Sequence, residues 1–163
     1  MITKEPTPLN IKDLDLVSTQ GSKISMLLFS KGKKSSSFKF DNEFHIINCI
    51  RAGLPKQAIH GILDNTAISR TQLAAILHIS TRQLNRYTDE DLLSAEQSNF
   101  LYELSRLYVR ATDVLGNKAT ADTWLHRQNT ALNDKTPIEM LDTIEGFRMI
   151  YDLLSQIEYG FFS

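Results

Sequence analysis

The sequence lacks the features of secreted, membrane-spanning and disulfide-stabilised proteins. A single cysteine among 163 residues excludes an internal disulfide, and Cys49 stands among apolar neighbours, which is typical of a buried and unreactive thiol. No apolar run reaches the roughly 18 residues that a membrane span requires. The N-terminus also lacks a basic segment followed by an apolar stretch, the pattern of a secretory signal. We therefore expect a cytoplasmic protein that has no membrane contact.

Motifs of catalysis and metal binding are missing as well. The four histidines are too far apart in the sequence for a local metal site, and they have no cysteine partners: His45, His60, His78 and His126. The sequence contains no glycine-rich phosphate loop and no nucleophile elbow. We predict no enzyme activity, no cofactor and no metal site. Enzyme activity would be compatible with the sequence only if a catalytic group were assembled in three dimensions from residues that are distant in the chain.

Positive and negative charges are distributed unevenly along the chain. Residues 1–88 contain twelve Lys and Arg against six Asp and Glu, whereas residues 89–163 contain six against thirteen. The sign changes directly after a segment that has the outline of two short helices, Ile68 to Tyr87. A basic region suits a polyanion, so we interpret the two halves as surfaces for different partners. The alternative is that charge segregates without function on a solvated surface.

The first 40 residues predict the least structure. Lys23–Phe29 fits a short strand or a helix. Lys31–Lys39 contains four lysines and fits either a soluble linker or a flexible basic arm that touches phosphates. We therefore describe residues 1–40 as a poorly defined N-terminal arm.

Beyond residue 40 the spacing of apolar residues predicts an all-α chain. One helix begins after Asp41 and ends at Gly53, and its expected apolar face consists of Phe44, Ile47 and Ile50, with Ile46 or Cys49 beside them. Capping boxes, in which a Ser or Thr is followed three residues later by Gln or Glu, begin helices at Ser94 and Thr136, and Gly116 and Gly160 end two later helices. These signals predict a helix-turn-helix domain over residues 41–90 and a helical domain over residues 91–163.

The segment from Ile68 to Tyr87 matches a helix-turn-helix. Two helices that cross at a steep angle need a small residue at the crossing point, and Ala74 provides it. Ser80 fits the N-cap of the second helix. His78 occupies the turn position that is commonly Gly, where a left-handed backbone costs a non-glycine residue some energy. The apolar positions that should face the core are Leu73, Ile76, Leu77, Ile79, Leu84 and Tyr87.

The remaining polar residues have the chemistry of a DNA-reading surface. Arg pairs bidentately with guanine, and Gln or Asn with adenine. The candidates on the second helix are Thr81, Arg82, Gln83, Asn85 and Arg86. The candidates for phosphate contacts, beside free backbone amides at the start of the first helix, are Arg70, Thr71 and Gln72. The alternative is a structural helical hairpin with a polar outer face.

An ordered series of residues follows the helix-turn-helix. It consists of Trp124-Leu125, Asn129, Leu132, Lys135-Thr136-Pro137, Met140-Leu141-Asp142-Thr143, Gly146, Ile157-Glu158, Gly160 and Phe161. Together with the helix-turn-helix, this series resembles the Xre/MbcA/ParS family of antitoxins over about residues 41–163. Two positions depart from the family's pattern: His78 in the turn, and Asn133-Asp134 where a glycine pair is common.

The resemblance implies an antitoxin of a type II toxin–antitoxin pair. Members commonly neutralise a RES-domain toxin, an enzyme that consumes NAD, and repress their own operon. The implied partners are therefore the cognate RES-domain toxin and operator DNA. Because one recognition helix contacts few base pairs, we also expect a homodimer on the DNA.

The acidic half would then be the toxin-binding domain. Its candidate contact residues lie at the end of the last helix and in the tail: Glu158, Tyr159, Gly160, Phe161, Phe162 and Ser163. Exposed aromatic side chains mark partner surfaces, but from the residues alone Phe161 and Phe162 fit a return onto the protein's own core almost equally well.

Two other functions remain compatible with the sequence. One is a plain helix-turn-helix transcriptional regulator whose C-terminal domain senses a small molecule or only dimerises. The other is a protein-interaction module that has lost DNA binding, which His78 and the near-neutral net charge of -1 would favour. The product of the neighbouring gene would separate an antitoxin from a plain regulator, because an antitoxin should be encoded beside a toxin.

Overall fold

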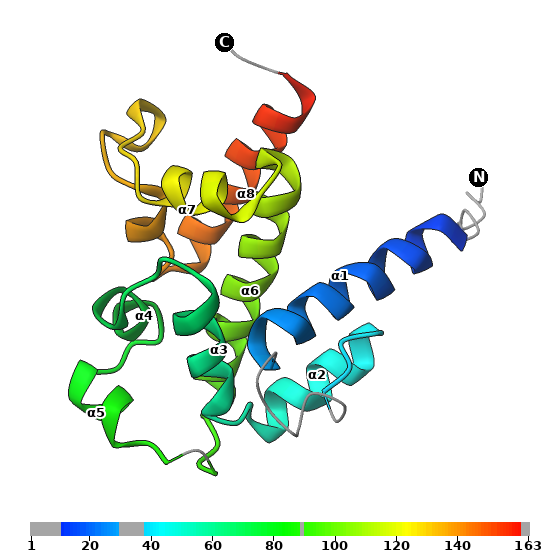
Figure 1. Ribbon diagram of the computed structural model, residues 1–163, viewed down its shortest axis with the longest axis vertical. Helices are drawn as coiled ribbons and strands as arrows, with labels where there is room; N and C mark the ends of the chain where they lie inside the picture. Colours follow the sequence, from blue (N-terminus) through cyan, green and yellow to red (C-terminus); the bar gives the residue numbers. More distant parts are fainter. Residues whose placement is uncertain (1–10, 30–37, 89, 161–163) are drawn as a thin grey trace, which may run out of the picture.

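A computed structural model describes residues 11–29, 38–88 and 90–160 (Figure 1). All regular elements in these ranges are helical, as predicted, and none of the helices is long and apolar enough to cross a bilayer. The α-helices are α1 (Ile11–Phe29), α2 (Glu43–Ala52), α3 (Gln57–Asn65), α4 (Arg70–Ile76), α5 (Thr81–Arg86), α6 (Ala95–Leu115), α7 (Lys118–Leu125) and α8 (Ile144–Tyr159). Two short 3-10 helices, η1 (Thr130–Leu132) and η2 (Pro137–Met140), connect α7 to α8.

The long helix α6 is the centre of the molecule (Figure 1). It packs against α1, α2, α7 and α8. The predicted capping box at its start is confirmed, because the Ser94 side chain accepts from the Gln97 amide and the Gln97 side chain accepts from the Ser94 amide. Gly116 ends the helix with φ 97°, a conformation that glycine adopts without steric cost. Both boundaries of α6 therefore follow from local sequence signals.

Helix α8 lies along α6 and forms the C-terminal layer with it. The ring centroids of Phe100 and Phe147 are 6.1 Å apart, and Arg106 Nε donates to the Tyr151 hydroxyl at 3.0 Å. Burial raises the pKa of Tyr151 to about 12, although the nearby Arg106 guanidinium acts in the opposite direction. Tyr151 is therefore a neutral acceptor for Arg106 at physiological pH, and the contact fixes the two helices side by side.

The description of residues 1–40 as a poorly defined arm needs correction for the part that the structure describes. Residues 11–29 form α1, which packs on α3 and α6. Ile24, Leu28 and Phe29 are buried, and Phe29 stacks on Phe38 at 4.9 Å. The helix thus belongs to the hydrophobic core. The lysine-rich segment expected as a basic arm lies largely outside the described residues.

The predicted apolar face of α2 is confirmed for Ile46, Cys49 and Ile50 but wrong for Phe44 and Ile47. Cys49 is buried, and Ile46 and Ile50 pack against the core, whereas Phe44 is 81% and Ile47 is 42% exposed. This helix has two apolar stripes. It packs on α6 with the stripe of Ile46, Cys49 and Ile50, and the stripe of Phe44 and Ile47 faces solvent. Cys49 is buried as predicted, and this burial raises the pKa of its thiol.

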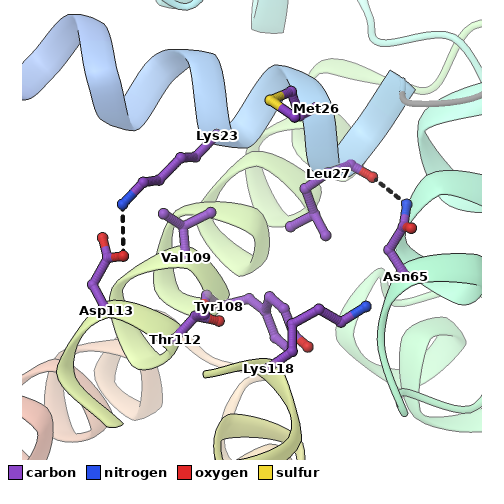
Figure 2. Close-up of a pocket in the computed structure, with 9 residues that line it drawn as sticks. All are labelled: Lys23, Met26, Leu27, Asn65, Tyr108, Val109, Thr112, Asp113 and Lys118. Carbon is purple, nitrogen blue, oxygen red and sulfur yellow. Dashed lines mark hydrogen bonds and ion pairs between the residues drawn. The ribbon is translucent and has the colours of Figure 1, made fainter. Parts of the chain in front are cut away.

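A cavity of about 360 Å³ lies between α1, the C-terminal end of α6 and the start of α7 (Figure 2). At its edge, Lys23 Nζ forms an ion pair with Asp113 at 2.6 Å. On the opposite side, Asn65 Nδ2 donates to the Leu27 carbonyl at 3.0 Å. Both polar contacts connect α1 to its neighbours, and the cavity is the apolar space that remains between them.

Candidate nucleic-acid interface and C-terminal surface

Helices α4 and α5 form the predicted helix-turn-helix, and each begins at a capping box. At α4, the Ser69 hydroxyl accepts from the Gln72 amide at 3.2 Å, and Gln72 Oε1 accepts from the Ser69 amide at 2.9 Å. At α5, Ser80 and Gln83 make the same pair of contacts at 3.1 and 3.0 Å. Reciprocal caps satisfy donors that a helix start otherwise leaves unpaired, so these short helices have sharply defined beginnings.

The core of the helix-turn-helix contains the apolar residues that the pattern predicts. Ala74 is 2% exposed at the crossing of the two helices, and its carbonyl accepts from the Ile79 amide at 3.0 Å. Ile79 and Tyr87 are half-buried and pack against the core. The fully enclosed positions are Leu73, Ile76, Leu77 and Leu84. This arrangement leaves the other residues of α5 on the surface.

The candidate base-reading residues are all exposed, but they are not equally available. Gln83 Oε1 accepts from the Ser80 backbone amide, so a bidentate contact of Gln83 with adenine would break the cap of α5. Asn85 Oδ1 accepts from Arg70 Nη1 at 3.2 Å, which joins α5 to α4. The other exposed candidates are Thr71, Thr81, Arg82 and Arg86. Arg82 and Arg86 are therefore the longest side chains of α5 that take no part in the contacts made by Gln83 and Asn85.

Gln72 has a structural position. It is half-buried, its side-chain oxygen caps α4, and the same oxygen lies 3.2 Å from His126 Nε2. A phosphate contact through this side chain would disturb both the cap and the packing of α7. The same S-x-x-Q signature that predicts the start of α6 occurs at Ser69, so the sequence contained a signal for this role.

His78 has φ 56°, so the turn adopts the left-handed conformation that favours glycine. Its ring contacts the C-terminal half of the chain: Nε2 donates to the Asp142 carbonyl at 2.6 Å, and the ring meets Phe100 edge-on at 4.7 Å. Nδ1 lies 3.6 Å from Glu96 Oε1. These contacts explain why a non-glycine residue can occupy the turn, because they offset part of the backbone strain.

Two further contacts connect the helix-turn-helix to α7. Asp122 Oδ1 accepts from the Ala67 amide and from the Tyr108 hydroxyl, both at 3.0 Å. Burial, and after it the hydrogen bond to Asp122, raises the pKa of Tyr108. His126 Nδ1 donates to the Asp122 carbonyl at 2.8 Å while its other nitrogen faces Gln72. The DNA-reading candidate is therefore fixed to the C-terminal helices along its inner side.

The loop before α8 also has left-handed backbone. Asn133 and Asp134 have φ 54° and 61°, a backbone conformation that glycine adopts most readily. The Asn129 side chain accepts from the Ala131 amide at 2.9 Å and begins η1. Asparagine and aspartate tolerate this region better than branched residues do, which fits their presence here.

The predicted toxin-contact residues lie at the end of α8 and beyond it. Glu158 forms an ion pair with Arg110 on α6, and Tyr159 is 68% exposed. Gly160 has φ 69° and ends the helix, as predicted. Phe161, Phe162 and Ser163 lie outside the described residues. Within the described ranges, no group of three or more His, Cys, Asp or Glu side chains is arranged to hold a metal ion.

Two family descriptions match the chain in the order of its two halves. Residues 49–106 match the antitoxin Xre-like helix-turn-helix domain. Residues 110–160 match the antitoxin Xre/MbcA/ParS C-terminal toxin-binding domain. Together the two matches extend from α2 to the end of α8.

Among solved structures, the chain is similar to one in the crystal structure of the M. tuberculosis MbcT-MbcA toxin-antitoxin complex. The sequence identity is 17% and the TM-score is 0.49, and the match covers 66% of this chain and 96% of that chain. No curated protein sequence matches the chain.

Proposed function

Because the chain belongs to the Xre/MbcA/ParS family of antitoxins, we propose that it neutralises a cognate RES-domain toxin, an enzyme that consumes NAD, and represses its own operon. The observation that carries this proposal is the order of the two matched domains, with a helix-turn-helix directly before a toxin-binding domain. The RES-domain identity of the toxin rests on the family resemblance of the sequence.

Operator binding is assigned to the exposed face of α5. Arg82 and Arg86 are separated by one helical turn and lie on the same side of the helix. Each can pair bidentately with a guanine in the major groove or with a phosphate. Arg70 and Thr71, exposed at the start of α4, would contact phosphates beside the base-reading surface. Thr81, Gln83 and Asn85 complete this surface as weaker contributors.

Operator recognition by this surface requires two copies of the chain. Helix α5 contains only six residues, so one copy can contact few base pairs. We propose a homodimer whose two recognition helices enter the major groove about 34 Å apart, or a multiple of that distance, on one face of the duplex. The operator should therefore contain two related half-sites.

Toxin binding is assigned to the C-terminal end of α8 and the residues after it. Tyr159 is exposed at this end, and Gly160 turns the chain out of the helix. We propose that Phe161 and Phe162 anchor the antitoxin in the toxin, because aromatic side chains at interface centres contribute much of the binding energy. Glu158 is paired with Arg110, so its role is to hold the end of α8 against α6 beside that contact.

Co-expression with the product of the adjacent gene tests the proposal. An antitoxin should co-purify with that product, relieve its toxicity and suppress its consumption of NAD. The same purified protein should shift its own promoter DNA in a gel and leave unrelated DNA unshifted at the same salt concentration. Promoter binding without a toxic partner would instead identify a plain helix-turn-helix regulator, and a partner without promoter binding would identify an interaction module.

A further inference from the structure

Helix α2 presents a second face to solvent, which does not pack on the core formed by the described residues. Its inward face packs on the core through Ile46, Cys49 and Ile50. Its outward face consists of residues that are all exposed: Glu43, Phe44, Ile47, Asn48 and Arg51. Phe44 is 81% exposed, which is unusual for a large aromatic side chain on a well-formed helix.

The outward face has a symmetric order of charge. Glu43 lies in the first turn of α2 and Arg51 in the last, and Ile47 lies midway between them. In an antiparallel pair of such helices related by a two-fold axis near Ile47, each Glu43 would face the Arg51 of the other copy. The two Ile47 side chains would meet at the axis, with Phe44 beside them. Isologous contacts require this kind of self-complementary surface.

We propose that this face of α2 is the contact between two copies of the chain. Charge complementarity favours a second copy as the occupant, because Glu43 and Arg51 of one copy match Arg51 and Glu43 of another. An unrelated protein has no reason to carry the matching charges. The apolar centre supplies the attraction, since burial removes Phe44 and Ile47 from water. The charged ends set the antiparallel direction. The expected link to operator affinity rests on the proposed DNA binding, whereas the contact itself does not.

The size of the face determines how strong this dimer can be. A helix of ten residues is about 15 Å long, so its outward face is small compared with the interface of a permanent dimer. We therefore expect a reversible monomer–dimer equilibrium in the micromolar range rather than an obligate dimer. Two adjacent operator half-sites would shift this equilibrium toward the dimer by raising the local concentration.

Analytical ultracentrifugation of the full chain over a range of concentrations tests the contact. The wild type should sediment as a concentration-dependent dimer, and Phe44→Glu should raise the dimer dissociation constant about tenfold or more. Met26→Glu is the matched control, because Met26 is 69% exposed on α1 and lies outside this face. Both side chains are exposed, so neither variant should lose helix content by circular dichroism.

A mixing experiment tests the proposed antiparallel pairing. Glu43→Arg and Arg51→Glu should each weaken self-association, because each variant places like charges opposite one another. A mixture of the two variants should form a heterodimer more tightly than either forms a homodimer, because every charged contact becomes attractive again.

Several results would overturn the inference. A wild-type chain that stays monomeric at all concentrations would do so, as would dimers that are equally strong in the wild type and in Phe44→Glu. Lack of recovery in the mixture would refute the antiparallel arrangement. Promoter affinity, measured beside sedimentation, separates this inference from the proposed function. A dimer that is unaffected by Phe44→Glu but still binds the promoter refutes only the α2 contact.

Discussion

Arginine has different roles in the two halves of the molecule. In the C-terminal half, arginines on α6 and α8 pair with glutamates at helical spacing or across the helix interface, in the pairs Arg106–Glu103, Arg110–Glu158 and Arg148–Glu145. On α5, no ion pair within the described ranges engages Arg82 or Arg86. The positive charge of these arginines therefore supports the fold in the C-terminal half, whereas that of Arg82 and Arg86 on α5 is available to a polyanion.

The halves differ in charge but are not independent bodies. The helix-turn-helix contacts the C-terminal helices through Ala67, Gln72 and His78. These contacts are on its inner side, whereas Arg82 and Arg86 are exposed on α5. One chain can therefore present two chemically distinct surfaces on helices that contact one another.

The largest effect on stability is expected from Gly61→Ala, which tests whether α1 belongs to the folded helix-turn-helix half. A Cβ at this position would lie 2.1 Å from the Leu28 carbonyl oxygen, so α1 and α3 would have to separate. We expect a loss of about 3 kcal/mol in the free energy of unfolding, at the upper end for overpacking. Urea denaturation measures it.

The control for that experiment is Gly116→Ala. No atom lies within 4 Å of a Cβ at Gly116, but its φ of 97° strains any L-residue. This variant should lose only about 1–2 kcal/mol. If the two variants were equally stable, the close packing of α1 on α3 would be refuted.

The next largest effect concerns the acidic half. Deletion of residues 161–163 should weaken toxin inhibition by about 2 kcal/mol or more, because it removes both proposed aromatic anchors. Promoter affinity and melting temperature should stay nearly unchanged. A large drop in melting temperature with preserved inhibition would instead show that the two phenylalanines belong to this protein's own core.

A smaller effect is expected at the junction of the halves. His78→Ala and His78→Gly both remove the ring contacts to Asp142 and Phe100, but only the alanine variant retains the strain at φ 56°. The glycine variant should therefore be more stable than the alanine variant by about 1–2 kcal/mol. Equal stabilities in thermal denaturation would mean that the turn does not adopt the left-handed conformation.

The smallest effect is expected within the ion pairs of the C-terminal half. The side chains of Arg148 and Glu145 are 68% and 66% exposed, whereas those of Arg110 and Glu158 are 29% and 36% exposed. Arg148→Ala should therefore destabilise the protein less than Arg110→Ala, which should lower the free energy of unfolding by about 1 kcal/mol. If Arg148→Ala destabilised the protein more than Arg110→Ala in urea denaturation, Arg110 would not stabilise the contact between α6 and α8.

Local signals in the sequence were sufficient for most of the helical boundaries. Capping boxes and left-handed glycines act within a few residues, so they predicted the start and end of α6 and the end of α8. For α1 the sequence left a strand and a helix open over Lys23–Phe29 and predicted nothing before Lys23, because the helix is stabilised by burial against α3 and α6, which are distant in sequence. The prediction of buried positions for Phe44 and Ile47 on α2 was wrong for a related reason, since the sequence of a helix with two apolar stripes does not reveal which stripe is buried.

The candidate site shows the same limit. The sequence indicated which residues of the helix-turn-helix are exposed, because the apolar core positions leave the polar ones outside. It did not indicate that His78 contacts Asp142, since the two residues are 64 positions apart. The S-x-x-Q pattern does indicate that Gln72 and Gln83 cap their helices, and in the structure this role competes with the base-pairing chemistry of glutamine.

The most direct test of the two-surface account is the Arg82→Ala/Arg86→Ala variant, measured for promoter affinity at fixed salt and for toxin inhibition. Each arginine that pairs with guanine contributes about 1–3 kcal/mol, so promoter affinity should fall by about 30-fold or more. Toxin inhibition should match the wild type, because the C-terminal surface is unchanged. Unchanged promoter affinity, or a folded variant that no longer inhibits the toxin, would contradict the account.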